Sequence, residues 1–193
     1  MISRLAGVGL LALGVVVPTM LTPAGTADLR AASDRRTCPP DVEIPARWPA
    51  ASVRSEDEVL ARINLLREQG VTCRATRTRH RPVPALEEDR ELRQAARMHS
   101  AYMAQKGAFD HTLEGCAFST WIDAAGYEWR SVGENIALRR GTRVVTAEAV
   151  VDRWLASKEG HCETLMDPKW RAAGVGHARA GTRQLWTVDF GDR

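Results

Sequence analysis

The sequence predicts an exported domain of the α+β class, in which helices cover a small sheet. Three observations support this prediction: an apolar leader, helical periodicity along much of the chain, and two segments of alternating polarity near the C-terminus. Helices and short strands are mixed without repeated strand–helix–strand units. That arrangement favours a layered α+β domain over a doubly wound parallel sheet.

The first 27 residues have the three parts of a secretory signal peptide. Arg4 is the only charged residue before Asp28, residues 5–17 are apolar, and Gly25-Thr26-Ala27 offers a small-residue cleavage site. A membrane helix is disfavoured, because Pro18 interrupts an apolar run that is shorter than the roughly 20 residues needed to span a bilayer. We therefore expect export and removal of residues 1–27.

The remaining chain divides into an arm and one domain. Residues 28–54 are rich in proline and arginine and show no sustained period, which indicates an extended arm. Residues 55–193 then form one domain that is long enough to bury a core. No second apolar run of spanning length follows the leader. We expect a mature chain without a membrane span, acting as a monomer.

Apolar spacing and capping residues predict the individual elements. The expected helices are residues 55–70, opened by a capping box at Ser55-Glu56-Asp57-Glu58, then 88–106, 118–125 and 146–157. The expected strands are residues 173–178 and 184–190, joined through Gly181, with a weaker strand or turn at 134–138.

Charge excludes one class of partner. Without Arg4, the 27 basic residues become 26 against 24 acidic residues, so the mature chain is close to neutral. The basic stretch from Arg74 to Arg81 could meet an anionic polymer, but it lacks the interleaved aromatic residues typical of nucleic-acid binding. We interpret it as a solvated loop and expect no nucleic-acid partner.

The cysteine count indicates two disulfides, because an exported chain with an even number of cysteines usually pairs them. None of the cysteines has the CxxC spacing of a zinc knot, and three pairings are open. Cys116 lies five residues after His111, and Cys162 directly follows His161. If the two histidines share a cleft, these two cysteines lie close together. We therefore predict the pairs Cys116–Cys162 and Cys38–Cys73.

Two imidazoles and a carboxylate stand in distinct local patterns. His111 follows Phe109-Asp110, Glu134 lies in Gly133-Glu134-Asn135-Ile136, and His161 follows Gly160. Such groups serve metal sites and acid/base sites. Each also has a structural interpretation: a loop histidine, a carboxylate that holds backbone amides, and a cation near a helix C-terminus.

The order of these and other motifs resembles the CAP superfamily of cysteine-rich secretory, antigen 5 and pathogenesis-related class-1 proteins, in its bacterial branch. The resemblance covers about residues 55–190 and implies an α-β-α sandwich with an antiparallel central sheet. Its motifs are Asn64-x-x-Arg67-x-x-Gly70, Ala96-x-x-His99-Ser100-x-x-Met103, Phe109-x-His111, Ala125-Gly126-Tyr127, Gly133-Glu134-Asn135-Ile136-Ala137, Val151-x-x-Trp154-x-x-Ser157, Gly160-His161, Gly174-Val175-Gly176 and Trp186-Thr187-x-x-Phe190-Gly191.

The resemblance also implies a site. CAP proteins often carry two histidines and two glutamates in a surface cleft, and some bind a divalent metal there. Three positions carry over as His111, Glu134 and His161, whereas Ser157 stands where the family has its second glutamate. We expect a binding cleft of these four residues, with His111 and His161 as ligands of a divalent metal such as zinc. A mechanism needing a second carboxylate would have to use Glu159 or Asp110.

Two further residues have structural interpretations. Ser157 and His161 stand four apart and, with Glu134, would resemble a hydrolase triad if the helix continued. Gly160 is expected to break that helix, and no Gly-x-Ser-x-Gly motif is present, so a serine nucleophile is not expected. His99 lies on the apolar stripe of its helix and is interpreted as a core histidine.

These observations predict a secreted or envelope protein that binds a ligand in a His/Glu cleft, the ligand being a lipid, a wall fragment or a divalent metal. Two alternatives stay open: a metal-assisted hydrolase that uses the same cleft, and a structural or toxin-like surface protein. If Glu134 were a metal ligand, it could not also act as the general base. Whether the chain is an enzyme is therefore undecided from the sequence.

Overall fold

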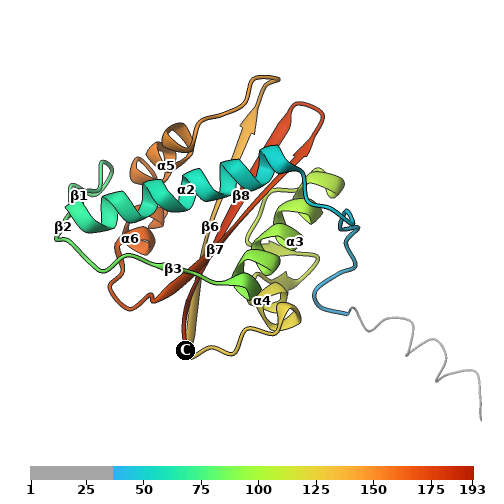
Figure 1. Cartoon of the computed structure of the whole chain (residues 1–193), viewed down its shortest axis with the longest axis horizontal. Helices are drawn as coiled ribbons and strands as arrows, with labels where there is room; N and C mark the ends of the chain where they lie inside the picture. Colours follow the sequence, from blue (N-terminus) through green and yellow to red (C-terminus); the bar gives the residue numbers. More distant parts are fainter. Residues whose placement is uncertain (1–36) are drawn as a thin grey trace, which may run out of the picture. The chain divides into compact units, whose positions relative to one another are not determined.

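The central sheet has the strand order β3-β7-β8-β6 in the computed structural model, which describes residues 37–193 (Figure 1). Strands β6 (Ser131–Arg140), β8 (Arg183–Asp192) and β7 (Ala172–Ala180) are antiparallel, as predicted. The short strand β3 (Glu87–Glu88) adds a parallel pairing to β7 that was not predicted. The predicted signal peptide lies outside the described residues. Within residues 37–193, no helix is long and apolar enough to cross a membrane.

Helices cover both faces of the sheet and complete the α-β-α sandwich (Figure 1). One layer contains α2 (Ala50–Gln69), α5 (Ala147–Leu155) and α6 (His161–Met166), and the other contains α3 (Arg90–Lys106) and α4 (Ser119–Ala125). Two hairpins project from these layers, β1 (Val71–Thr72) with β2 (Arg79–His80), and β4 (Thr112–Leu113) with β5 (Cys116–Ala117).

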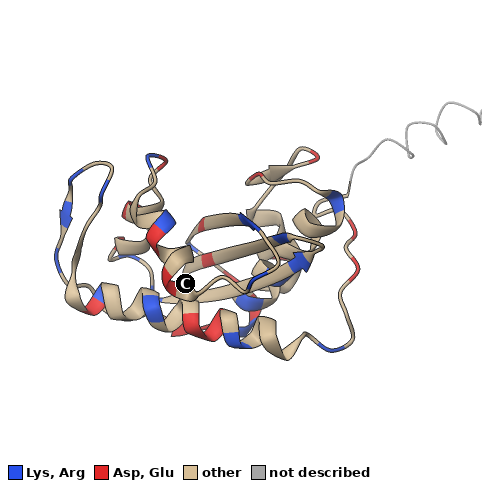
Figure 2. Cartoon of the chain, turned by 90° about the horizontal axis from the view of Figure 1, so that it is seen from above, with Lys and Arg blue, Asp and Glu red and all other residues tan. Residues whose placement is uncertain are grey.

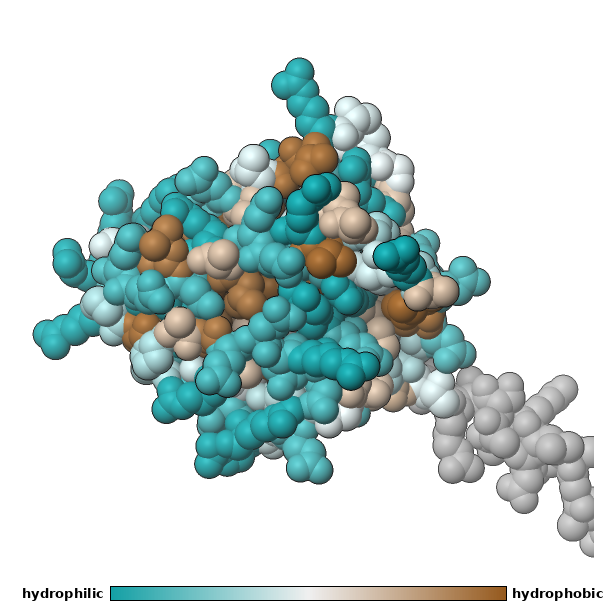
Figure 3. Space-filling model, in the orientation of Figure 1, coloured by the Kyte–Doolittle hydropathy of each residue, from teal (hydrophilic) through white to brown (hydrophobic). Residues whose placement is uncertain are grey.

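Alternation along β8 supplies both halves of the core. Trp186 and Val188 pack toward α2 and α5, whereas Leu185 packs toward α3. Because both faces are covered, all residues of β8 between its two ends are buried on both sides of the sheet. Where apolar side chains do reach the surface, they form separate small patches on the face shown in Figure 3.

Helix α3 lies directly against β7 because two glycines leave room for its backbone. A Cβ atom at Gly174 would lie 1.9 Å from the Arg93 nitrogen, and one at Gly176 would lie 2.2 Å from the Ala96 carbonyl carbon. Asp89 caps the helix by accepting hydrogen bonds from the backbone amides of Glu91 and Leu92, and Gly107 ends it at φ 68°. The predicted helix at 88–106 is thus confirmed to within two residues.

The predicted capping box at Ser55 is wrong, because α2 begins five residues earlier, at Ala50 after Pro49. A proline before the first turn and two alanines start the helix without a side-chain cap. Ser55 and Glu56 are therefore free to face inward. Ser55 Oγ accepts a hydrogen bond from Trp186 Nε1 at 3.0 Å.

Glu56 joins three parts of the fold although it is fully buried. Its carboxylate accepts hydrogen bonds from Trp48 Nε1 at 2.7 Å and from the His177 backbone amide at 2.9 Å, and it forms an ion pair with Arg97. It thus connects the arm, the outer edge of β7 and α3. A buried carboxylate with this many partners is compensated for the hydration it loses.

The Asn64-x-x-Arg67 motif holds loops onto α2. Asn64 exchanges two hydrogen bonds with the backbone of Leu86, at 2.8 and 3.0 Å. The buried guanidinium of Arg67 donates to the carbonyls of Pro84, Leu165 and Asp167. Burial is the main reason that the pKa of Arg67 is lowered to about 10.

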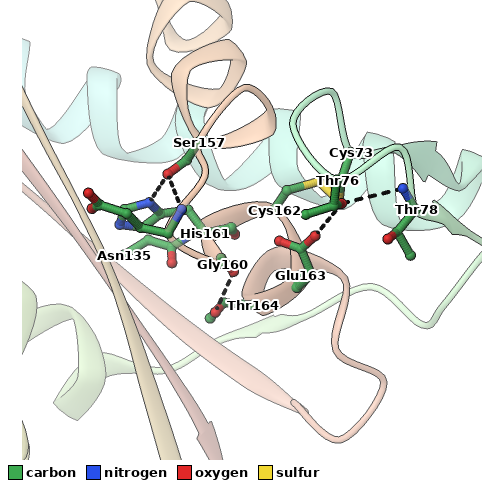
Figure 4. The surroundings of a disulfide bond; sticks show 11 residues. Cys73, Thr76, Thr78, Asn135, Ser157, Gly160, His161, Cys162, Glu163 and Thr164 are labelled. Atoms are coloured by element: carbon green, nitrogen blue, oxygen red, sulfur yellow. Dashed lines mark hydrogen bonds between the residues drawn. A yellow bond between two sulfur atoms is a disulfide. The ribbon is translucent and has the colours of Figure 1, made fainter.

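The predicted disulfide pairing is wrong. The structure pairs Cys38 with Cys116 and Cys73 with Cys162. The first bridge ties the arm to β5, and the second ties the β1–β2 hairpin to α6. The reasoning failed because neighbouring residues of a helix point about 100° apart. Cys162 points to the core below the β1–β2 hairpin, whereas His161 points to the cleft (Figure 4).

Candidate functional site

Glu134 is held by two histidines inside the α3 layer. Its side chain is 1 % exposed, and its Oε1 atom accepts a hydrogen bond from His111 Nδ1 at 2.7 Å. Its other oxygen pairs with Nδ1 of His99, which is fully buried on α3 and stacks on Trp121. Asp110, considered above as a second carboxylate, instead accepts the Thr112 amide in a local turn.

Ser157 and His161 form a second pair in the α5–α6 turn (Figure 4). Ser157 Oγ lies 2.7 Å from His161 Nδ1 and also accepts the Glu159 amide at 3.1 Å. Helix α5 ends at Leu155, two residues before the predicted end, and a turn through Gly160 brings the two side chains together. The hydroxyl thus braces a turn.

A short helix that was not predicted, α6, begins at His161. His161 is the first residue of α6 and so lies at a helix N-terminus, where the macrodipole disfavours a cation. The side chain of Asn135 donates to the His161 carbonyl at 2.9 Å and fixes the start of α6. Asn135 and Glu134 point to opposite faces of β6, as alternate strand residues must.

The two pairs meet across the outer edge of β6. The rings of His111 and His161 stack with centroids 5.9 Å apart and an interplanar angle of 28°. His111 lies in the loop after α3, on one side of the sheet, and His161 is the first residue of α6, on the other side. The edge of the sheet therefore separates their backbones. The structure therefore brings together all four predicted residues, and it adds His99, which sequence reasoning left in the core.

The electrostatics of the two imidazoles differ. The hydrogen bond to Glu134 is the main cause of a raised pKa at His111, opposed by partial burial. Burial, followed by the nearby His111, lowers the pKa of His161. His111 is thus the more readily protonated member of the pair, and His161 stays neutral to lower pH.

A cleft of about 380 Å³ opens beside His161. Its walls combine apolar side chains with two cations and a carboxylate. The lining residues are Phe109, Ile136, Ala137, Arg153, Trp154, Ala156, Ser157, Lys158, Glu159 and His161. This volume and mixture are typical of sites for small molecules.

Asp189 is a buried carboxyl group beside this cluster that sequence reasoning missed. It pairs with Glu134 in the register of β6 and β8 and is 1 % exposed. Burial, and then the charge of Glu134, raise its pKa well above the usual value. Its place opposite Glu134 depends on strand register, which the sequence did not reveal. The only local signal was an acidic residue within an apolar strand.

The donor set fits a metal only in part. The Nε2 atoms of His111 and His161 have no hydrogen-bond partner among residues 37–193. Neither atom is buried, so both are open to a ligand. Both oxygens of Glu134 are engaged by histidines, so two imidazoles are available where catalytic zinc usually has three protein ligands. The hydrogen bonds of Glu134 and Ser157 at the two Nδ1 atoms would orient these ligands.

A different cluster has three metal-binding residue types within 4.8 Å of one another: Cys73, His80 and Glu163. It is the only such group in the described part of the chain. Cys73 is bonded to Cys162, however, and metals bind a thiolate rather than a disulfide sulfur. We do not assign it as a metal site.

The basic stretch forms the β1–β2 hairpin at the end of the molecule (Figure 2). Arg77, Arg79 and Arg81 are exposed, and Arg74 pairs with Asp152 at 3.1 Å. This agrees with the predicted solvated loop.

Comparison with known proteins decides the family. The profile of the CAP, or cysteine-rich secretory protein, family matches residues 60–190. The chain belongs to the CAP family. Its matched region includes every residue of the cleft, so the site lies within the CAP domain. No curated protein matches the chain.

Solved CAP-type structures share the fold at low sequence identity. An extracellular protein with an SCP domain from Bacillus anthracis is 18 % identical with a TM-score of 0.58, covering 77 % of this chain and 45 % of its own. An outer surface protein from Borrelia burgdorferi is 21 % identical with a TM-score of 0.55, covering 70 % and 90 %. A protein named NaASP2, solved with Zn²⁺, is 14 % identical with a TM-score of 0.54, covering 75 % and 84 %. This CAP chain thus spans less than half the length of the Bacillus protein.

Proposed function

We propose that this CAP domain is secreted or held at the cell envelope and binds a ligand against His111 and His161. The observation that carries the proposal is the anchoring of both imidazoles through Nδ1, by Glu134 and by Ser157, each at 2.7 Å. This anchoring fixes the rings and leaves both Nε2 atoms available. Pre-oriented polar atoms bind a ligand with little ordering cost.

The charges favour a ligand that carries an acidic group. A protonated His111 offers an Nε2–H donor. When Ser157 donates to Nδ1 of His161, the ring proton of that neutral histidine is on Nε2, which also becomes a donor. Arg153 and Lys158 line the cleft beside His161. A carboxylate or phosphate of a wall fragment would accept from these groups, while its apolar parts contact the Trp154 wall.

A divalent metal requires the opposite protonation. Zinc binds the lone pair of a neutral imidazole, so His111 would lose its proton and His161 would carry its proton on Nδ1, donating to Ser157. With two protein ligands, the remaining positions belong to water or to the bound molecule. We therefore expect weaker zinc binding than at sites with three or four protein ligands, increasing with pH.

Calorimetric titration tests this proposal with two probes, zinc chloride and a muramyl dipeptide that represents a wall fragment. The purified chain should bind at least one of them with 1:1 stoichiometry, and the His111→Ala/His161→Ala double variant should lose that binding. His80→Ala removes a partly exposed histidine outside the cleft and should leave it unchanged. If neither probe binds, or if the double variant binds as the parent does, the cleft is not a ligand site.

A metal-assisted hydrolase is the second candidate, and one observation favours it. Glu159 lines the cleft and its charge acts on both histidines. It could serve as the base that Glu134, with both oxygens engaged, cannot provide. Turnover of a muramyl peptide that Glu159→Gln abolishes, with binding retained, would favour this candidate.

A further inference from the structure

A second cavity, of about 390 Å³, lies at the edge of the sheet opposite to the His111–His161 cleft. It lies against the end of β7, beyond the two residues that pair with β3. The arm, the first turn of α2 and the last turns of α3 supply its other walls. Its volume falls in the range of small-molecule sites.

The walls of this cavity are mostly apolar. Pro45 and Trp48 of the arm face Ala101 and Ala104 of α3, and Val144, which is 69 % exposed, also lines it. Two hydrogen bonds hold the arm over the cavity. Gln105 Nε2 donates to the Glu43 carbonyl at 2.7 Å, and Trp48 Nε1 donates to the Glu56 carboxylate at 2.7 Å. The cavity is therefore built by specific contacts.

His177 is the unusual residue of this cavity. It lines the cavity and is 3 % exposed, yet neither ring nitrogen has a hydrogen-bond partner among residues 37–193. Its ring is fixed, because its backbone amide donates to Glu56 and the ring stacks on Trp186 with centroids 4.5 Å apart. A buried imidazole without partners is costly, and such groups commonly mark a ligand or water position.

A second polar group lies nearby. Ser52 also lines the cavity and is 5 % exposed, and its hydroxyl can both donate and accept a hydrogen bond. Neither it nor a neutral imidazole offers a countercharge. Arg97, the cation beside Trp48, is already paired with Glu56. Two other charged residues line the cavity, Arg179 and Glu43, but both are exposed to solvent and opposite in sign. Solvent screens their charges, so a charged head buried at His177 would be only weakly compensated, whereas an uncharged polar head would find hydrogen bonds at the ring.

We infer that this cavity binds an apolar molecule with one uncharged hydrogen-bonding head, the class of long-chain alcohols, with its head at His177 and Ser52. The neutral ring can donate through one nitrogen and accept through the other, and a hydroxyl head can do both. The apolar chain then lies between the arm and α3. The site is independent of the His111–His161 cleft.

Decan-1-ol is the probe, with decanoate as its charged counterpart at pH 8. Calorimetry, supported by tryptophan fluorescence, should show 1:1 binding of the alcohol and at least tenfold weaker binding of the carboxylate. Ala51→Phe places a ring into the cavity from an exposed position of α2 and should abolish binding. Ala61→Phe makes the same change at an exposed α2 position outside the cavity and should not.

The head-group assignment has its own test. His177→Phe keeps the ring stacked on Trp186 but removes both nitrogens, and it should weaken decan-1-ol binding about tenfold. Ser52→Ala gives a second, milder probe of the same contact. The inference is wrong if Ala51→Phe and Ala61→Phe bind decan-1-ol equally, if decanoate binds as well as the alcohol, or if both head-group variants bind like the parent. The His111→Ala/His161→Ala variant should bind decan-1-ol normally.

Discussion

His161 and Cys162 are adjacent in sequence but belong to different parts of the molecule (Figure 4). His161 stacks on His111 at the edge of β6, and Cys162 forms a disulfide with Cys73 below the β1–β2 hairpin. The disulfide fixes α6 at one side while the histidine faces the cleft on the other. The position of a cleft residue thus depends on a covalent bond that lies outside the cleft.

Disulfide mapping should recover the peptide pairs Cys38–Cys116 and Cys73–Cys162. The bridges span 78 and 89 residues, so the chain-entropy model allows about 4–5 kcal/mol of stabilisation for each. Cys73→Ala/Cys162→Ala should therefore lower the unfolding free energy in urea by up to about this amount. Recovery of a Cys116–Cys162 peptide would contradict the structure.

Glu134→Gln should lower the pKa of His111, because the hydrogen bond and charge of this carboxylate raise it. A ¹H–¹⁵N NMR titration of the imidazole measures the shift. Glu159→Gln is the matched control and should lower the same pKa by less, because Glu159 acts only through its charge. Equal shifts in the two variants would mean that His111 is not hydrogen-bonded to Glu134 in solution.

Ser157→Ala should leave the fold intact and cost about 0.5–1.5 kcal/mol of stability, the net value of one hydrogen bond. Ser157→Glu should strengthen zinc binding, because a carboxylate at His161 Nδ1 would orient the ring and increase its basicity, as Glu134 does for His111. Calorimetry compares both variants with the parent. Loss of a hydrolytic activity in Ser157→Ala, or an acyl adduct on Ser157, would instead identify a serine nucleophile.

Stability should fall in acid partly because of His177, whose pKa burial lowers to about 4, with a smaller effect of Arg179. In the unfolded chain His177 binds a proton near pH 6.5, whereas in the folded chain it binds one only near pH 4. The contribution is present above pH 6.5 and lost as pH falls toward 4, by about 3 kcal/mol. The nearby ion pair of Glu56 and Arg97 is present both in the parent protein and in the His177→Phe variant used for the test below.

The comparison is between the parent and His177→Phe in urea unfolding from pH 7 to pH 4. The variant should lose less stability over this range. Parallel pH profiles for the two proteins would show that His177 titrates normally in the folded state.

Asp189→Asn should stabilise the protein at neutral pH. Burial and Glu134 raise the pKa of this carboxyl group, so the folded chain keeps a proton that the unfolded chain releases. Its stabilising contribution is full below pH 3.8 and is lost as pH rises through the higher folded value. An amide does not titrate, so the gain should be larger at pH 7 than at pH 3. A variant that is less stable than the parent at pH 7 would refute this assignment.

The sequence by itself determined the family, the layered fold and the main helices, because these depend on local periodicity and on the order of short motifs. Helix α3 is an example: its apolar spacing, its Asp89 cap and Gly107 are all within the segment. The same ordered motifs pointed to His111, Glu134, Ser157 and His161 as neighbours, and the structure brings these side chains together.

Only the tertiary structure decided which groups these residues touch. Glu134 meets His99 and Asp189 because of helix placement and strand register, which involve residues 35 and 55 positions away in sequence. The disulfides failed as a prediction because sequence distance does not report the direction of a side chain on a helix. Cavities such as that at His177 arise where four separate segments meet, and no local pattern encodes such a meeting.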